Sequence, residues 1–291
     1  MRSSPGRKAV LFFIFLIMLF IVVVTLYPML YVLFASFSDP RQFLQHRGLL
    51  LWPTGYSVLS YRYLIEDASV LRSFGNSFLI MFSGVAINMV MTILGAYFLS
   101  RKNVLWKNAV MVLILITMYF NGGLVPSYIN IKNLGMYNNY LALIFPAAIS
   151  TTNLIILRTA FAGLPAGVEE SAIIDGAGHL TLISRIVVPL CFPTIAVLIL
   201  YYAVGHWNSW FPAMIYLQDK VLFPLQLILR EKLILMEQNA SATGGDIGDS
   251  FMIRETMKYA IIVLSSIPML VLYPFIQRFF VKGVMIGSIK G

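Results

Sequence analysis

The chain has 291 residues, of which 59% are hydrophobic and 11% are charged, and its formal net charge is +9. Soluble domains carry about 25% charged residues, so this balance excludes an ordinary soluble protein and removes nucleic acid as the explanation of the positive charge. The single cysteine, Cys191, leaves no disulfide framework or cysteine-rich metal cluster within the chain, and we interpret it as a buried thiol.

Long apolar runs predict an all-α membrane protein with six membrane-spanning helices. Each run reaches the roughly 20 residues that a helix needs to cross the bilayer core, whereas a β-barrel would show alternating segments of about ten residues. The runs cover residues 9–37, 74–100, 108–130, 140–162, 190–217 and 259–281. We therefore predict one transmembrane domain over 1–291, with the first span uncleaved because it is too long for a signal peptide.

The distribution of basic residues predicts the orientation in the membrane. Arg2, Arg7 and Lys8 precede the first span, and basic residues also border the loops that would share its side. Positive charge is denser there than in the outer loops, which favours a cytoplasmic N-terminus. Six spans then place the C-terminus and the polar stretch between the fourth and fifth spans, residues 164–189, in the cytoplasm as well.

The third predicted span is interrupted between Tyr119 and Pro126. The segment reads Tyr119-Phe120-Asn121-Gly122-Gly123-Leu124-Val125-Pro126. Non-helical backbone at membrane depth is tolerated against protein or along a water-filled path. Two interpretations are open, a segment that lines a pathway and a plain kink near the outer interface.

The polar stretch 164–189, called the 164–189 loop below, predicts a short helix that begins near Pro165. Proline is tolerated in a first helical turn, and the carboxylates of the pair Glu169–Glu170 complement the helix dipole there. Ala172 and Gly176 are four residues apart, so we predict that they share a helix face small enough for close approach of another protein. Gly178 is the predicted stop of this helix. The alternative is an ordinary amphipathic loop helix.

The spacing of Glu170, Ala172, Gly176, Ile186 and Pro189 resembles the EAA loop of ABC-importer permeases. Its one departure is Ser171, where the pattern usually has alanine. The resemblance implies that the loop is a coupling helix that docks in a cleft of a separate ATP-hydrolysing subunit. The coupling residues that it implies are Glu169, Glu170, Ser171, Ala172, Asp175, Gly176, Ala177, Ile186 and Pro189.

The fifth predicted span combines aromatic and amide side chains around Trp207. Aromatic faces stack on sugar rings and amides pair with hydroxyl groups, which is the mixture that a carbohydrate site uses. The alternative is an aromatic belt at the outer membrane interface. Together with the interrupted third span, the candidate pathway residues are Tyr119, Asn121, Trp207, Asn208, Trp210 and Phe211.

The tail 282–291 follows the sixth span and carries Gly283, Gly287 and Gly291. Its lack of side-chain bulk predicts an extended, mobile segment. The tail resembles the C-terminus of carbohydrate-importer permeases of the maltose-transporter type, a resemblance that extends over nearly the whole chain. It implies that Gly287, Lys290 and Gly291 reach the interface of an ATPase dimer.

This resemblance implies the permease subunit of a binding-protein-dependent ABC importer for oligosaccharides, and the substrates that it implies are fragments of plant or algal polysaccharides, including uronate-containing ones. The implied partners are a second, related permease, two ATPase copies, an extracytoplasmic solute-binding protein and the bilayer. The chain has no G-x-x-x-x-G-K-[ST] phosphate loop, so ATP and magnesium are expected on the ATPase subunits. No catalytic residue, metal ligand or cofactor is predicted in this chain.

Three other functions are weighed against this one. An ABC permease for a non-sugar solute would share the 164–189 loop and differ in the pathway. An ion-coupled secondary carrier would show internal repeats and acidic or lysine side chains at membrane depth, and neither is evident in the sequence. A membrane-embedded enzyme would need convergent acid, base or metal ligands, which three histidines and one cysteine do not supply.

Overall fold

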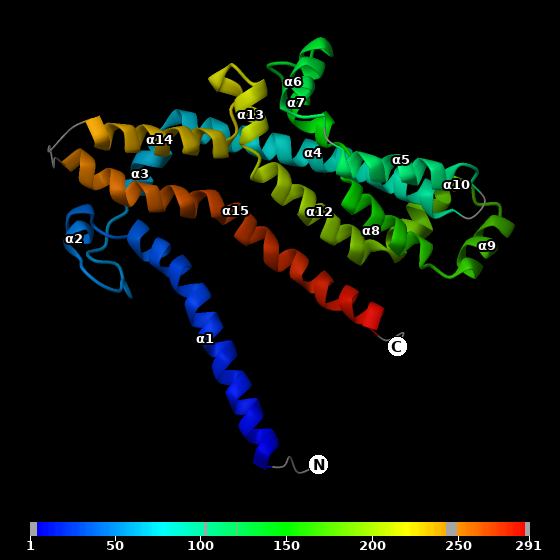
Figure 1. The fold of residues 1–291 in the computed structure, drawn as a ribbon, viewed down its shortest axis with the longest axis horizontal. Coiled ribbons are helices and arrows are strands. Elements are labelled where there is room, and N and C mark those ends of the chain that lie inside the picture. The colour runs from blue at the N-terminus through cyan, green and yellow to red at the C-terminus, as the bar shows by residue number, and fades with distance from the viewer. Residues whose placement is uncertain (1–4, 102–103, 121, 243–248, 289–291) are drawn as a thin grey trace. The chain divides into compact units, whose positions relative to one another are not determined.

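The computed structural model describes residues 5–101, 104–120, 122–242 and 249–288, and every regular element in these ranges is helical (Figure 1). The elements of the first half are α1 (Pro5–Ser36), α2 (Pro40–Gln45), α3 (Leu59–Glu66), α4 (Ala68–Ser100), α5 (Lys107–Tyr119), α6 (Leu124–Asn133), α7 (Leu141–Ile144) and η1 (Phe145–Ala147). Those of the second half are α8 (Thr151–Ala162), α9 (Ala166–Ile174), α10 (His179–Thr181), η2 (Leu182–Val187), α11 (Val188–Leu190), α12 (Phe192–Trp207), α13 (Phe211–Tyr216), η3 (Lys220–Leu222), α14 (Leu225–Ala242) and α15 (Asp249–Ser288).

Three helical stretches are long and apolar enough to cross a membrane, and they are Gly6–Ser36, Ala68–Ser100 and Met252–Pro274. Three pairs of shorter helices also qualify if each bent pair is one span. These pairs are α5 with α6, bent by 117°, α7–η1 with α8, bent by 49°, and α10–α11 with α12, bent by 86°. The described part of the chain thus has three candidate spans, or up to six, which confirms the predicted all-α membrane protein at that level.

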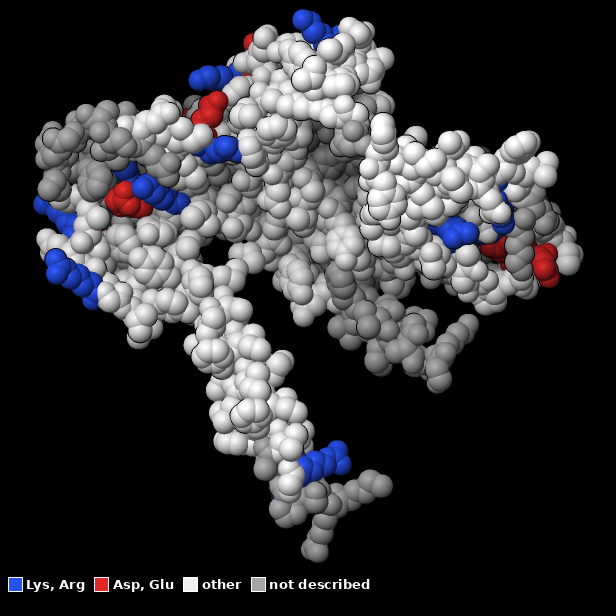
Figure 2. All heavy atoms as spheres, viewed as in Figure 1, with Lys and Arg blue, Asp and Glu red and all other residues white. Residues whose placement is uncertain are grey.

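Charged side chains avoid the apolar stretches of these helices. Figure 2 shows that the visible length of α1 carries no charged side chain until its N-terminal end. Most side chains of α1 are apolar and exposed within this chain. Such a surface is stable against lipid or another apolar protein surface.

The chain divides into two compact units, and the first consists of Met1–Val70 and Leu229–Ile267. In this unit the Tyr31 ring packs edge-on against Tyr259, with centroids 5.8 Å apart. The hydroxyls of Ser60 and Thr256 share a buried hydrogen bond of 2.9 Å. These contacts join the last turns of α1, and α3, to the first half of α15.

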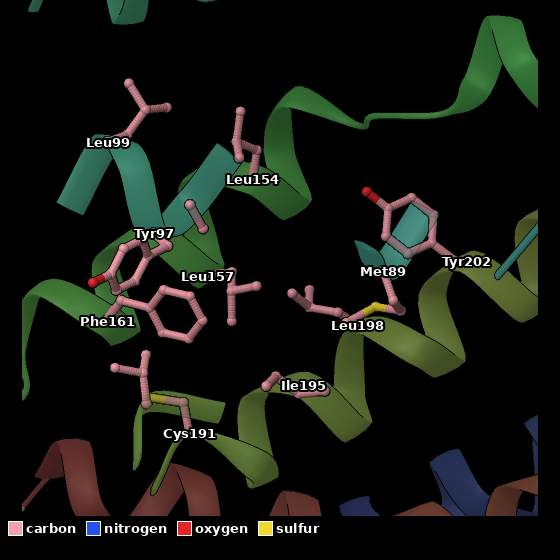
Figure 3. Packing of buried hydrophobic residues seen from close by; sticks show 12 residues of the cluster. Met89, Tyr97, Leu99, Leu154, Leu157, Phe161, Cys191, Ile195, Leu198 and Tyr202 are labelled. Carbon is pink, nitrogen blue, oxygen red and sulfur yellow. The ribbon is translucent and has the colours of Figure 1, made fainter. Parts of the chain in front are cut away.

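The second unit consists of Leu71–Ile228 and Pro268–Gly291, and its core lies among α4, α8, the end of η2 and α12. Its buried side chains include Cys191, in agreement with the expected buried thiol. Figure 3 shows this cluster, whose members are Met89, Ala96, Tyr97, Leu99, Leu154, Leu157, Phe161, Val187, Cys191, Ile195, Leu198 and Tyr202.

A bend between η1 and α8 leaves backbone groups that side chains of two neighbouring helices satisfy. The Asn88 amide of α4 donates to the Ala147 carbonyl at 2.5 Å, and the Asn88 carbonyl oxygen lies 2.6 Å from the His206 Nε2 of α12. The Ser150 N–H donates to the Tyr202 hydroxyl at 3.1 Å. Unsatisfied backbone groups are costly in a membrane, so these partners make the bend possible.

The fifth predicted span, 190–217, is not one continuous helix. The helix α12 ends at Trp207, and α13 resumes at Phe211. Pro212, the second residue of α13, explains the break, because it lacks the N–H that would bond to the Asn208 carbonyl and its ring clashes with that carbonyl.

The last helix is longer at both ends than the predicted span 259–281. It begins at Asp249 and continues to Ser288, so the expected extended conformation of the tail is wrong for residues 282–288. The residues between Gly283 and Gly287 are Val284, Met285 and Ile286. Each glycine weakens a helix by about 1 kcal/mol, a cost that the cooperativity of a long helix can offset.

Candidate functional site

The 164–189 loop begins with α9, which opens where the sequence predicted. Pro165 is its N-cap residue, with φ of −60° and ψ of 127°, and Glu169 lies in the first turn. Within α9, whose residues are all described, Ala172 is the one buried side chain. The other coupling candidates on this helix, Glu170 and Ser171, are exposed.

Gly176 ends α9 in a Schellman motif. The Gly176 N–H donates to the Ile173 carbonyl at 3.0 Å, and the Ala177 N–H donates to the Ala172 carbonyl at 2.9 Å. Gly176 itself has φ of +81°, in the left-handed region. The predicted stop at Gly178 is therefore wrong, and the stop is Gly176.

This geometry also corrects the expected small-residue face. Ala172 is buried inside the helix, whereas Gly176 lies beyond its end, so the two residues do not form one exposed helical face. Asp175, the C-cap residue, is exposed beside them, and Ala177 is half-buried. A spacing of four residues defines a face only while the helix continues.

The exposed part of the loop is formed by large apolar side chains on both sides of the Gly176 turn. Ile174 is 85% exposed and Leu180 is 79% exposed, and Ile173 is exposed as well. The sequence reasoning missed these residues, although a hydrophobic residue within a charged, extramembrane loop is a usable signal. Ile186 and Pro189 lie further along, in η2 and α11, on the way back to α12.

A cavity of about 650 Å³ lies between the end of α4 and the loop. The guanidinium of Arg101 forms an ion pair with the Glu169 carboxylate across it. Their side chains are 15% and 23% exposed. The other polar side chains of its lining include Tyr97, Glu170 and His179.

The candidate pathway residues divide between the core and the surface. Trp207 is 1% exposed and packs against Phe74 and Phe78, with ring centroids 5.9 and 5.3 Å away, so its ring faces are occupied by protein. Asn208, at the C-cap of α12, is exposed instead. The interpretation of Trp207 as a sugar-stacking residue is therefore wrong for this conformation.

The remaining pathway and tail candidates are placed as follows. Tyr119 is exposed at the end of α5. The rings of Trp210 and Phe211 pack edge-on where α13 begins, with their centroids 5.4 Å apart. Gly287 lies in α15. Asn121, Lys290 and Gly291 lie outside the described residues.

The described side chains do not bring together a metal site. Among the residues that the structure places, no group of three or more His, Cys, Asp and Glu side chains lies close enough to hold a metal ion.

Comparison with known proteins gives strong similarity over nearly the full chain, although no protein-family model matches it. The chain is 39% identical to "Protein LplC" of Bacillus subtilis over 269 residues, which cover 92% of this chain and 90% of that protein. It is 38% identical to the "Polygalacturonan/rhamnogalacturonan transport system permease protein YtcP" of Bacillus subtilis over 268 residues, or 91% and 92% of the two chains.

Two solved structures share the fold. One is a chain of a bacterial ABC transporter involved in the import of the acidic polysaccharide alginate, with a TM-score of 0.86, 28% identity, and coverage of 96% and 99% of the two chains. The other belongs to a bacterial alginate ABC transporter in complex with an alginate pentasaccharide-bound periplasmic protein. It has a TM-score of 0.58 at 18% identity, covers 93% of each chain, and supports the fold alone.

Proposed function

The chain belongs to the permease subunits of ABC transporters for sugar and oligosaccharide import, and we propose that it forms one half of the membrane pathway of an importer for uronate-containing oligosaccharides. Because it belongs to this family, the chain is an integral protein of the cell membrane. One Bacillus subtilis relative is named for polygalacturonan and rhamnogalacturonan, and the transporter of similar structure imports alginate. These polymers share sugar carboxylates, so acidic oligosaccharides are the substrate class that we assign.

The observation that carries the energy-coupling part of this proposal is the exposed apolar tip of the 164–189 loop. Ile174 and Leu180 project beside the Gly176 turn and are largely unburied by this chain. The charged residues Glu170 and Asp175 border them, so the tip is too polar to rest in hydrocarbon. An apolar patch with a charged rim is typical of a protein interface, and the partner that we assign to it is the ATPase subunit.

The complete importer then consists of this chain, a second and related permease, two ATPase subunits and an extracytoplasmic solute-binding protein. Both termini of this chain and its 164–189 loop lie in the cytoplasm, where ATP is available. ATP and magnesium bind to the ATPase subunits, and this chain catalyses no chemical reaction. The substrate travels between the two permeases, along surfaces that we propose to include Tyr119, Asn121, Asn208, Trp210 and Phe211.

A cysteine-protection experiment tests the docking surface. Cys191 is the one native cysteine and is replaced by alanine, after which Ile174→Cys supplies a single exposed thiol. In inside-out membrane vesicles we expect a membrane-impermeant maleimide to label this thiol in the permease alone, and the bound ATPase subunit to protect it.

The matched control is Leu105→Cys, an exposed position in the connection between α4 and α5, on the same predicted side. It should react with and without the ATPase subunit. Equal labelling of Ile174→Cys in both preparations would show that the ATPase docks elsewhere. Labelling from the outer side of the membrane alone would show that the 164–189 loop does not lie in the cytoplasm.

A further inference from the structure

The last turn of α4 contacts both arms of the 164–189 loop. Tyr97 lies in the last turn of α4, and Arg101 is the first residue after the helix ends. Arg101 pairs with Glu169 on α9, before the Gly176 turn. The Tyr97 hydroxyl lies 2.9 Å from Nδ1 of His179, the first residue of α10 after the turn.

These four residues form one connected group, which we call the α4 anchor. The Arg101 guanidinium carbon lies 4.4 Å from the centroid of the Tyr97 ring, so the two contacts with the loop also support each other. A planar guanidinium can lie flat on a ring and donate to a carboxylate from its edge, a geometry that suits arginine better than lysine. Partial burial of the Arg101–Glu169 pair makes it stronger than an ion pair in open solvent.

Little else holds α9 to α4. Ala172 is the one buried side chain of α9, and the cavity of about 650 Å³ occupies the space between the end of α4 and the loop. Apolar packing therefore does not fill this space. The polar contacts of the α4 anchor cross it and fix the orientation of the loop relative to α4.

We propose that Tyr97, Arg101, Glu169 and His179 are positioning residues that make α4 move together with the 164–189 loop when the ATPase subunits close. The chain itself connects the loop to α8 and α12, and the α4 anchor adds a third helix to the coupled set. This inference rests on the proposed docking of the ATPase on the loop. It assigns to α4 a role in energy coupling that does not follow from its covalent connections.

The test compares ATP use with sugar uptake in the complete importer reconstituted in liposomes. Arg101→Gln should leave the complex assembled but reduce the stimulation of ATP hydrolysis by loaded binding protein, and the sugar taken up per ATP, by about fivefold or more, as expected when a typical allosteric coupling is lost. Tyr97→Phe, which keeps the ring under Arg101 and removes the hydroxyl, should give a smaller loss of both quantities. The double variant R101E/E169R should recover part of the stimulation.

The matched control is Arg62→Gln, which removes an exposed ion pair to Glu66 in the other unit and should change neither quantity. If the wild-type importer couples ATP hydrolysis to uptake and both Arg101→Gln and Tyr97→Phe retain its full stimulation and uptake per ATP, the α4 anchor is ruled out. If the wild-type importer shows no ATP-dependent uptake at all, the proposed function fails instead. If the Arg101→Gln complex does not assemble, the stimulation and uptake per ATP of Tyr97→Phe, compared with those of wild type, decide whether the α4 anchor is involved.

Discussion

At Gly176 the backbone turns with φ of +81°, a conformation that glycine enters freely and that costs other L-residues about 1 to 2 kcal/mol. A Cβ atom built at this position would meet nothing within 4 Å in this chain. The need for glycine in the isolated permease is therefore conformational and not a matter of space. Asparagine enters the left-handed region more easily than most other non-glycine residues. An asparagine variant therefore distinguishes a conformational need for glycine from a need for space.

The prediction is that Gly176→Asn retains most of the uptake while Gly176→Val loses most of it. The β-branched valine opposes the left-handed turn, so the Ile174 and Leu180 side chains on its two sides would be misplaced. Uptake by the reconstituted importer and co-purification of the ATPase subunit measure the effect. Equal losses in the two variants would instead indicate that side-chain bulk in the docked complex decides, and would contradict the conformational explanation.

Single residues also show where sequence reasoning reached its limit. The spacing pattern placed Gly176 on one helix face with Ala172, because it could not show that the helix ends there. The composition around Trp207 indicated a sugar site, yet composition does not tell which side of a helix faces Phe74 and Phe78. Burial depends on tertiary neighbours, and those are not encoded in the local pattern.

At the scale of the elements, the apolar runs predicted where helices lie but concealed most of their bends. The interruption before Pro126 was visible because two glycines and a proline mark it, and α5 and α6 are indeed bent by 117° there. The bends near Ser150 and Cys191 were not predicted, although Pro146 precedes the first and Pro189 and Pro193 flank the second. They depend on partners in other helices, of which the polar contacts of α4 and α12 are the clearest.

These partners form two adjacent pairs on the same two helices. Asn88 contacts His206, and Thr92 shares a hydrogen bond of 2.7 Å with the Tyr202 hydroxyl, so each helix contributes residues four apart. Gly84, one turn before Asn88, makes room for the His206 ring, which a Cβ atom there would overlap. This arrangement holds the bend at Ser150 in a single geometry.

We predict that Tyr202→Phe destabilises the permease by about 1 to 3 kcal/mol, because it leaves the Ser150 N–H and the Thr92 hydroxyl without this partner. At roughly 2 to 4 °C per kcal/mol for a unit of this size, the Tm in detergent should fall by several degrees. The neighbouring Tyr201→Phe is the control, since Tyr201 is exposed. A Tm that falls equally in both variants, or in neither, would contradict a bracing role.

At the scale of the whole molecule, the chain has the surface of an incomplete assembly. The apolar side chains of α1 are exposed along most of its length, and the tip of the 164–189 loop presents Ile174 and Leu180. Lipid can cover the first surface, and we propose that the ATPase subunit covers the second. The sequence reached this conclusion through its resemblance to importer permeases, whereas the exposed side chains of the loop required the structure.

The most direct test of the central claim is uptake by the purified importer in liposomes that contain ATP. We predict that oligogalacturonides presented with the solute-binding protein enter the liposomes and stimulate ATP hydrolysis, and that neutral oligosaccharides of equal length do neither. Omission of the ATPase subunits should abolish uptake. Uptake that persists without those subunits, or ATP hydrolysis that does not respond to any loaded binding protein, would contradict the assignment of this chain as the permease of an ATP-driven oligosaccharide importer.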